Sequence, residues 1–594
     1  MKRTHLPVFI LLNFVLWGLL SLFYYGINGF FPSVYGILFT TLFIVAHIGL
    51  MALLFGGVCV LLYKLDEKHF HYTAITAGTL CSLLLGADIF IFSQYRAHLN
   101  PSMVRFFFSP AGQEFFPFLS AMGGIFFGGI VLLGLMQWGL ERLSTKITFS
   151  KKTFFILLGI WAFCFAAYNG LYAWGEWKRL PAVTDQRPLL PYASLWPADK
   201  LLRKMGFKPD QEPVVLPKKH YLHYPLQPLT CTVPMKNILF IIVKSWRADS
   251  VTPDVMPTLS KRKSDYAMSY FSNHISAGNS TAAGVFSLFY SLPYSYWDDI
   301  TARQQPPVLI TQAQKMGFTT AVFSGSDLKT PSLHRNAFAA IPDLPQGETG
   351  QSPWENDTQA VENFEKFLDT PQRSLFLATI FLEAPFFNSY PPKEAHFAPA
   401  PAINYFLLTP NTPPIPYKNR YKNALHFTDT LIERIFNDLQ QRDLLGNTLV
   451  IITGDHGKEI NDTQHNNWAA NSNFSTYQTQ VPLFVWFPGG PRRGERSALT
   501  SHFDIVPTLM TMLFNCTTAT SAYSIGRDLF DATPHSYILM EDEQAIAVRN
   551  DNRLSILDAY GHVKFYNENL RPMQEGVNPE SVNEALATQT RFYY

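Results

Sequence analysis

At 594 residues the chain exceeds the usual size of one domain, so we expect more than one. Its formal net charge of +2 gives no electrostatic reason to expect a nucleic-acid partner. The 47% hydrophobic content averages two unlike halves, because the long apolar runs all lie in the first.

Five apolar runs in the first half are each long enough to cross a bilayer, which takes roughly 20 residues. They lie at about 7–25, 36–63, 74–93, 116–140 and 153–174. A soluble core does not explain them, because only short loops separate the runs. The first run lacks a small-residue cleavage site, so we interpret it as a span and not as a removable signal. The sequence therefore predicts a transmembrane domain over residues 1–175.

The basic residues of the loops predict how these spans are oriented. They gather before the first span and after the second and fourth, at Lys2, Arg3, Lys64, Lys68, Arg142, Lys146, Lys151 and Lys152. By the positive-inside rule, the N-terminus is cytoplasmic and everything after the fifth span is outside. In a Gram-negative bacterium this predicts an inner-membrane protein with a periplasmic C-terminal half.

Asp88 is the unusual residue of the spans, because a carboxylate within a bilayer is costly and is by default a functional hypothesis. The alternative is that Asp88 lies near the surface, pairs with Arg96 and only fixes packing. Apart from Asp88, the spans offer few polar side chains for a transport path, which argues against a channel or transporter.

Residues 176–230 form a linker that is rich in prolines and in basic side chains. Within it, residues 198–206 predict a short helix with an apolar and a basic face, ending at Gly206. Directly outside the last span, such a helix would lie along the membrane and meet anionic head groups. A solvated connector helix packed on the soluble domain is an equal alternative.

Residues 231–594 alternate strand and helix patterns. Continuous apolar or β-rich runs predict strands at 238–243, 319–323, 375–381, 448–453 and 482–487, and a helical repeat covers 423–439. This order predicts an α/β domain with a mainly parallel sheet. Cys231 and Cys516, the two cysteines outside the spans, allow one disulfide in an oxidising compartment, and the cysteine spacing is not of a metal-binding type.

Residues 450–457 read as a buried strand that ends in a glycine turn and presents Asp455 beside His456. Ligands and metals gather at the carboxyl ends of parallel strands, and an adjacent Asp and His supply half of a metal site. The alternative is an Asp that caps a helix beside an exposed His.

Further motifs surround this segment at 237–249, 278–281, 477–483 and 502–509. In this order they resemble the sulfatase / alkaline phosphatase superfamily. Together with the five spans, Leu99-Asn100-Pro101 and residues 523–530, they make the chain similar to membrane-anchored relatives of the lipoteichoic acid synthases and phosphoethanolamine transferases. The resemblance implies a sulfatase-like fold in which active members use a Ser or Thr nucleophile activated by divalent metal.

Carried onto this sequence, the family pattern places Ser280 at the nucleophile position, with Thr281 beside it, and Asp455 and His456 among the metal ligands. Residues 278–281 also lead into a predicted helix around 283–290, whose N-terminal amides favour an anion and whose start any of the polar residues could cap.

Three other positions depart from the pattern. Lys244 replaces the first carboxylate ligand, Glu383 replaces a histidine, and Ala470 stands where the last histidine is expected. A charged ammonium group cannot ligate a cation, and Lys244 would pair with Asp455 if it pointed into the site. Asp249 and His465 are substitutes that lie out of register.

These departures favour a sulfatase-like domain without a working metal centre and without a cofactor. The resemblance then implies an inner-membrane regulatory protein of lipopolysaccharide balance in the outer membrane, which binds lipid A or cardiolipin and acts on other inner-membrane regulatory proteins. The lipid phosphates would be contacted by basic residues of the linker, namely Arg187, Lys200, Arg203 and Lys204. The alternative is a phosphatase, sulfatase or phosphoglycerol/phosphoethanolamine transferase that holds one Mn, Mg or Zn ion at Asp455, His456 and Glu383.

Overall fold

The computed structural model divides the chain into two compact units, residues 1–212 and 213–594. It describes the chain apart from residues 1–4, 29–32, 96–97, 100–122, 148–149, 179, 185, 187–188, 192–205, 207–220, 233–235, 266–267, 348–350, 371–373, 404–407, 490–492, 532, 534, 544, 551, 559–562, 574 and 594. The helix predicted at 198–206 falls outside the described residues except for Gly206.

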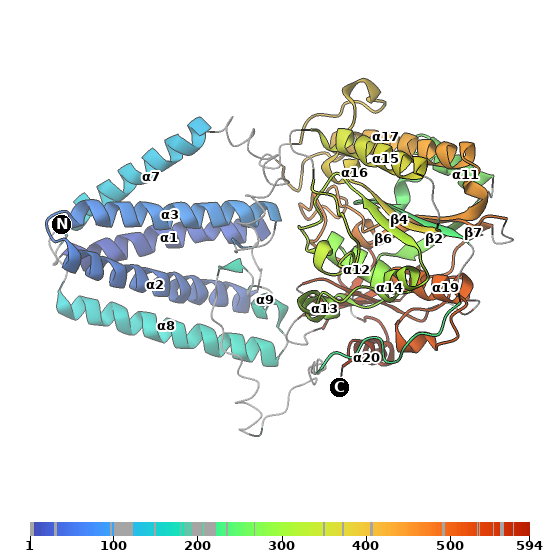
Figure 1. The fold of residues 1–594 in the computed structure, drawn as a ribbon. Helices are drawn as coiled ribbons and strands as arrows, with labels where there is room; N and C mark the ends of the chain where they lie inside the picture. Colours follow the sequence, from blue (N-terminus) through green and yellow to red (C-terminus); the bar gives the residue numbers. More distant parts are fainter. Residues whose placement is uncertain are drawn as a thin grey trace. The chain divides into compact units, whose positions relative to one another are not determined.

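Long apolar helices build the first unit (Figure 1). They are α1 (Leu6–Asn28), α2 (Val34–Leu65), α3 (Phe70–Tyr95), α7 (Gly123–Ser144) and α8 (Lys151–Trp177). Among the described residues, four of them are long and apolar enough to cross a membrane, namely all but α7. The short α9 (Pro181–Thr184) follows α8. Four predicted spans are thus confirmed as candidate spans, and α7 coincides with the described part of the fourth predicted run.

Buried polar side chains, which the sequence reading did not single out, join three of these helices. Gln137 of α7 donates to Asn13 of α1 (2.6 Å) and to Ser82 of α3 (3.1 Å), and all three are buried. The Gln137 amide nitrogen thus bonds to both neighbouring helices, whereas Gln137 Oε1 is buried without a hydrogen-bond partner among the described residues. These hydrogen bonds therefore link α1, α3 and α7.

Asp88 of α3 is also buried and hydrogen-bonded. Its carboxylate accepts from the Tyr24 hydroxyl (2.6 Å) and the Leu99 amide (2.6 Å) and lies 2.7 Å from His98 Nδ1. The predicted partner Arg96 lies outside the described residues. These contacts fit the packing interpretation of Asp88.

The second unit is an α/β domain around a mixed sheet with the strand order β3-β4-β1-β5-β6-β2-β7 and β8 paired to β2. Its strands are β1 (Asn237–Val243), β2 (Ser269–Ile275), β3 (Thr319–Phe323), β4 (Phe376–Leu382), β5 (Thr448–Gly454), β6 (Gln480–Trp486), β7 (Gly494–Arg496) and β8 (Thr500–Ser501). Strands β3, β4, β1 and β5 are mutually parallel, whereas β6 runs antiparallel to both of its neighbours. The mainly parallel sheet and all five predicted strands are confirmed.

Alternate residues of β1 enter two different cores, because successive side chains of a strand point to opposite faces. Ile238, Phe240 and Ile242 pack with α12 (Thr281–Tyr290), α14 (Val308–Lys315) and α19 (Ile505–Met512). Leu239, Ile241 and Val243 pack with α15 (Pro353–Asp369) and α17 (Ile415–Gln441). Helices therefore cover both faces of the sheet (Figure 1), which explains why β1 is apolar throughout.

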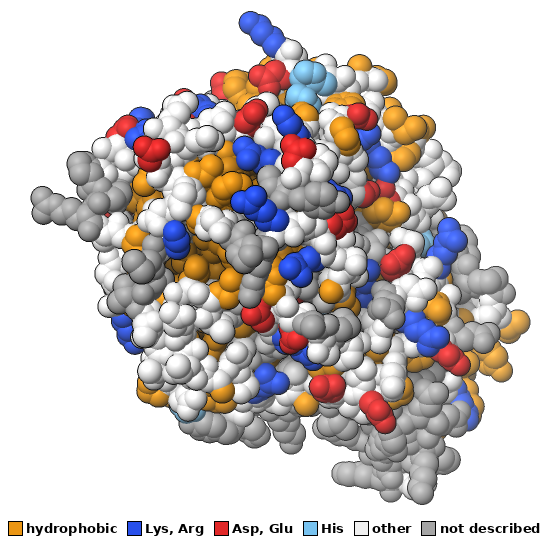
Figure 2. Space-filling model, turned by 90° about the vertical axis from the view of Figure 1, so that its right-hand side faces the viewer, with side chains coloured by type: hydrophobic (Ala, Val, Ile, Leu, Met, Phe, Trp, Pro, Cys, Tyr) orange, Lys and Arg blue, Asp and Glu red, His pale blue; other side chains and the backbone are white. Residues whose placement is uncertain are grey.

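A second, antiparallel sheet completes this unit. It consists of β9 (Ile538–Glu541), β10 (Ala545–Asn550), β11 (Arg553–Asp558) and β12 (Val563–Asn567), and α20 (Pro579–Thr588) packs against it. Short helices α11 (Pro257–Ser264), α13 (Trp297–Arg303), α16 (Ala384–Phe387) and α18 (Thr476–Thr479) lie in the connections. Figure 2 shows Lys and Arg interspersed with Asp and Glu on one face of the molecule, with no large patch of a single sign.

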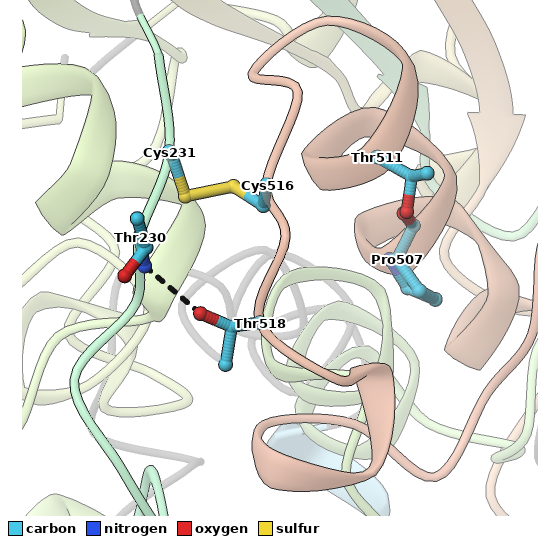
Figure 3. Close-up of a disulfide and its surroundings, with 6 residues drawn as sticks. All are labelled: Thr230, Cys231, Pro507, Thr511, Cys516 and Thr518. Atoms are coloured by element: carbon cyan, nitrogen blue, oxygen red, sulfur yellow. Dashed lines mark hydrogen bonds between the residues drawn. A yellow bond between two sulfur atoms is a disulfide. The ribbon is translucent and has the colours of Figure 1, made fainter.

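A disulfide joins Cys231 to Cys516 (Figure 3). Beside it, the Thr230 amide donates to the Thr518 hydroxyl (2.9 Å), and the Thr517 amide donates to the Thr230 carbonyl (3.0 Å). The start of the second unit is thus tied to the end of α19 by a covalent bond and by hydrogen bonds. This is the pairing that the two cysteines outside the spans allowed.

Candidate functional site

Three residues directly follow neighbouring parallel strands. Lys244 follows β1, Glu383 follows β4 and Asp455 follows β5. The last residues of these strands lie in register, so the next residue of each strand lies beside the other two. Lys244 stands in the middle, at the edge of the sheet where ligands gather in open α/β folds.

The Lys244 ammonium forms an ion pair with Glu383. Its Nζ lies 2.9 Å from Glu383 Oε1, and the two side chains are only 11% and 6% exposed. Burial alone would lower the pKa of Lys244, but the carboxylates of Glu383 and Asp455 outweigh it and raise that pKa above its ordinary value. The nearest partner is therefore Glu383 and not Asp455, which interacts with the ammonium over a longer range.

Glu383 is itself held in place. Its second oxygen accepts from the Ser326 hydroxyl, and the backbone amides of Glu383 and Ala384 donate to Asp357 of α15 (2.8 and 2.7 Å). Burial raises the pKa of Asp357 well above its ordinary value. Sequence reasoning missed Asp357, although its spacing on α15 places it among buried residues such as Ala360 and Val361, an unusual position for a carboxylate.

Thr281, and not Ser280, presents its hydroxyl to the Asp-His pair. Thr281 Oγ1 donates to Asp455 Oδ2 (2.7 Å) and lies 3.2 Å from His456 Nε2. The Ser280 hydroxyl instead caps α12 by accepting from the Ala283 amide. Of the two predicted residues at the start of this helix, Ser280 therefore caps the helix and Thr281 belongs to the site.

Gly284 sets the approach of α12 to the strand-end residues. A Cβ atom at this position would lie 1.8 Å from the Asp455 carbonyl oxygen. Since no side chain separates the two backbones, the first turn of α12 lies directly against Asp455. This contact brings the Thr281 hydroxyl within hydrogen-bonding reach.

Two backbone amides donate to the other carboxylate oxygen of Asp455. Its Oδ1 accepts from the amides of Ser245 and His456, each at 2.8 Å. His456 Nδ1 lies 2.7 Å from the Gly457 carbonyl, and burial lowers the pKa of the His456 imidazole. Asp455 is fully buried and His456 nearly so, so both side chains are fixed by the fold.

A second buried lysine lies beside this cluster. Lys458 Nζ donates to the carbonyls of Pro385 (3.1 Å) and Phe386 and to Asn388 Oδ1 (3.3 Å). Burial lowers the pKa of Lys458 to about 7. The Nζ atoms of Lys244 and Lys458 lie 5.0 and 5.7 Å from the centre of the Phe386 ring. In the sequence, the only indication of a role for Lys458 is that it directly follows Asp455, His456 and Gly457.

The other predicted positions do not complete a ligand set. Ala470 lies in a loop against the turn before α12, where the amide of Asn471 donates to the Asn279 carbonyl (2.9 Å). The Asp249 carboxylate pairs with Arg247 (2.6 Å) and is largely exposed. His465 is exposed as well. Neither substitute reaches the strand ends.

These residues do not fit a divalent cation. A cation between Glu383 and Asp455 would have to take the place of the Lys244 ammonium, and charged lysine offers no lone pair. The oxygens of Asp455 already accept three hydrogen bonds, two from backbone amides. No group of three or more His, Cys, Asp or Glu side chains is arranged to hold a metal in the part of the chain that the structure describes.

The four predicted lipid-contacting residues, Arg187, Lys200, Arg203 and Lys204, lie outside the described residues. Gln186 and Pro191, which flank Arg187 in sequence, are described and contact the first unit. Gln186 donates to the Gly36 carbonyl (3.0 Å) and accepts from Thr40 (2.6 Å), and His47 Nε2 lies 2.7 Å from the Pro191 carbonyl. The start of the basic linker therefore packs on α2.

Two family models match the chain in succession. Residues 236–515 match the sulfatase family, and residues 4–231 match a family described as a domain of unknown function, DUF3413. The sulfatase match contains all three strand-end positions and Thr281. The second match contains every apolar helix of the first unit.

Relatives are similar along most of the chain. The inner membrane protein YejM of Salmonella typhimurium is 24% identical over 580 residues, which are 94% of this chain and 91% of YejM. An uncharacterised protein of Haemophilus influenzae is 25% identical over 524 residues, covering 85% and 80% of the two chains. A crystal structure of a protein in the alkaline phosphatase superfamily from Vibrio parahaemolyticus, 16% identical, covers 68% of this chain and 98% of that structure with a TM-score of 0.47.

Proposed function

Since this chain is a YejM homologue that joins apolar membrane helices to a sulfatase domain, we propose that it is a lipid-binding regulatory protein of lipopolysaccharide balance in the outer membrane. In this proposal the sulfatase-like domain faces the periplasm and has lost metal-dependent catalysis. Membrane lipids are its ligands, and other inner-membrane regulatory proteins are its partners.

The ion pair of Lys244 with Glu383 carries the proposal. The sulfatase family uses a carboxylate at the first position and metal charge at this edge of the sheet, whereas here an ammonium group supplies that charge. Without a metal, the Thr281 hydroxyl lacks the activation that metal coordination gives to a nucleophile. The hydrogen bond from Thr281 to Asp455 then serves to hold the fold.

A periplasmic location of the second unit is supported by two independent features. The positive-inside rule predicts it from the loop charges. The Cys231–Cys516 disulfide suits an oxidising compartment, and cytosolic disulfides are rare.

The lipid-binding part of the proposal rests on the basic linker. Gln186 and Pro191, which flank Arg187 in sequence, are hydrogen-bonded to α2, and α2 is a candidate membrane span. Arg and Lys bind phosphate through charge-assisted hydrogen bonds. We infer that Arg187, Lys200, Arg203 and Lys204 contact the phosphates of lipid A.

Native mass spectrometry of the full chain in detergent, titrated with lipid A, tests this inference. Replacing Arg203→Ala together with Lys204→Ala is expected to weaken binding by at least about tenfold, since each charge-assisted hydrogen bond contributes about 1.5–3 kcal/mol. The double variant Lys151→Ala, Lys152→Ala at the start of α8 removes two exposed lysines on the predicted cytoplasmic side and is expected to bind as wild type. Equal affinity of all three proteins would exclude the linker as the lipid site.

The alternative, a metal-dependent phosphatase or transferase, is favoured by the Thr281 hydroxyl, which lies where a nucleophile is expected beside Asp455 and His456. Hydrolysis of a phosphate ester that is lost on Thr281→Ala would support that activity and contradict the proposal.

A further inference from the structure

A cavity in the second unit is lined by none of the strand-end residues. Its volume is about 490 Å³, within the range of roughly 300–1,000 Å³ that small-molecule sites have. Its walls come from Ser501 and Phe503 and from the chain between residues 520 and 591, including β9 and the end of α20. Most of the lining lies beyond residue 515, where the sulfatase match ends. The cavity is therefore not a remnant of the family's catalytic centre.

Two arginines line this cavity, Arg527 and Arg591. The Arg591 guanidinium donates to the Ser524 carbonyl (3.1 Å) and keeps further N–H groups for other acceptors. Among the described residues, no carboxylate lies within ion-pairing distance of either guanidinium. Glu584 is the acidic side chain of the lining, so the two positive charges exceed the negative one.

Asp504, next to the cavity, does not neutralise the arginines. Both of its oxygens lie within 3.0 Å of His535 Nε2, and it also accepts from the amides of Ser501 (2.7 Å) and Arg527 (2.9 Å). The carboxylate oxygens of Asp504 thus bind the backbone amide of Arg527 and the ring of His535. His535 itself lines the cavity. The local fold therefore fixes the backbone of Arg527, whose exposed side chain lines the cavity.

Another part of the cavity lining is apolar. Phe503, Ile538 and Leu539 line the cavity, and all three are buried. A ligand that fits this lining has an anionic end for the guanidinium groups and an apolar body for the wall. Two arginines exceed what one carboxylate needs, whereas a phosphate monoester has three terminal oxygens and can accept from both.

We propose that this cavity binds a phosphate monoester carried on a small apolar group, with Arg527 and Arg591 contacting the phosphate. The site is independent of the linker that we assign to lipid A and of the strand-end residues. The phosphate can belong to a soluble ester or to the head group of a monoester lipid.

Isothermal titration calorimetry of the full chain in detergent with phenyl phosphate tests the site. Wild type is expected to bind, and Arg527→Gln and Arg591→Gln are each expected to weaken binding about tenfold or more. Arg335→Gln, which removes an exposed arginine elsewhere in the unit, is the matched control and leaves the affinity unchanged. Phosphatidic acid added to the micelles displaces phenyl phosphate if the natural source is a lipid head group, and fails to displace it if the source is a soluble ester.

Two results would overturn the proposal: no binding by wild type, or wild-type affinity in both cavity variants. Loss of binding on Thr281→Ala with the arginine variants unaffected would place the phosphate at the strand ends and reject the cavity. Should Arg591→Gln lower the unfolding temperature because Ser524 loses its partner, Arg527→Gln decides alone, since no hydrogen bond of the Arg527 guanidinium occurs in the described part of the chain.

Discussion

Lys244 places a positive charge at the strand end where the resemblance to the sulfatase family leads us to expect a carboxylate ligand of a metal. The ammonium is held by Glu383 at 2.9 Å and by the more distant charge of Asp455, and its pKa is raised above the ordinary value. It therefore stays charged at neutral pH, and a divalent cation beside it would meet electrostatic repulsion. In the function that we propose, this one residue supplies the charge of the metal and removes one of its expected ligands.

Reversing this substitution should restore a metal site. The double variant Lys244→Asp, Ala470→His returns two ligands to the Asp455–His456 pair, and we expect close to one Mn²⁺ per chain after incubation with excess metal and gel filtration. Wild type treated in the same way should carry no metal above background. Elemental mass spectrometry measures both.

The matched control adds Asp455→Ala to the double variant, which should return the metal content to background. Stoichiometric metal in wild type that disappears with Asp455→Ala would show that Lys244 does not exclude the cation, and it would contradict the pseudoenzyme proposal.

For single residues, the sequence could predict which side chains lie at the same edge of the sheet. It could not predict which of them form ion pairs or hydrogen bonds with one another. Strands β1, β4 and β5 are directly followed by Lys244, Glu383 and Asp455, and parallel strands bring such residues to one edge of the sheet. The partner of Lys244 depended on side-chain geometry, and Glu383 lies closer than the expected Asp455. Ser280 and Thr281 could not be separated in advance, because either hydroxyl suits a helix start.

Among the elements, α12 determines whether Thr281 can reach Asp455. Gly284 packs against the Asp455 backbone, and the 1.8 Å that a Cβ atom would leave to the carbonyl oxygen is far below van der Waals contact. We expect Gly284→Ala to lower stability by about 1–3 kcal/mol through overpacking, although alanine favours a helix by about 1 kcal/mol.

Thermal unfolding of the full chain in detergent, followed by tryptophan fluorescence, measures this effect. Gly446→Ala is the control, because a Cβ atom there meets nothing within 4 Å, and its unfolding temperature should match wild type. An unchanged temperature for Gly284→Ala would mean that α12 can move away from Asp455 at little cost.

The strands differ in how well their sequences predict them. β1 and β5 are buried on both faces and therefore read as continuous apolar runs. β2 has the sequence Ser-Tyr-Phe-Ser-Asn-His-Ile, a bulged register and polar residues that bond across the sheet, such as His274 to Thr500 (2.9 Å). Its partners β6, β7 and β8 lie more than 200 residues later in the chain. The local sequence therefore does not predict β2 as a strand.

On the scale of the whole molecule, a disulfide connects the segment before β1 to the segment after α19. Cys231 precedes β1 and Cys516 follows α19, 285 residues apart in sequence. A bridge across so long a loop restricts the unfolded chain strongly, and loss of a native disulfide commonly costs about 2–5 kcal/mol in small secreted domains. The bridge also makes the compartment of the domain measurable, because it forms only where thiols are oxidised.

We therefore expect the two cysteines to report a periplasmic domain in intact cells. In a variant with Cys59, Cys81 and Cys164 replaced by Ala, a membrane-impermeant maleimide added to spheroplasts of a Gram-negative host should label nothing until a reductant is added. After reduction it should label two sites. Adding Cys231→Ser should leave Cys516 free and labelled without reductant. Labelling that requires permeabilised membranes would place the domain in the cytoplasm, and it would overturn both the predicted orientation of the spans and the periplasmic part of the proposed function.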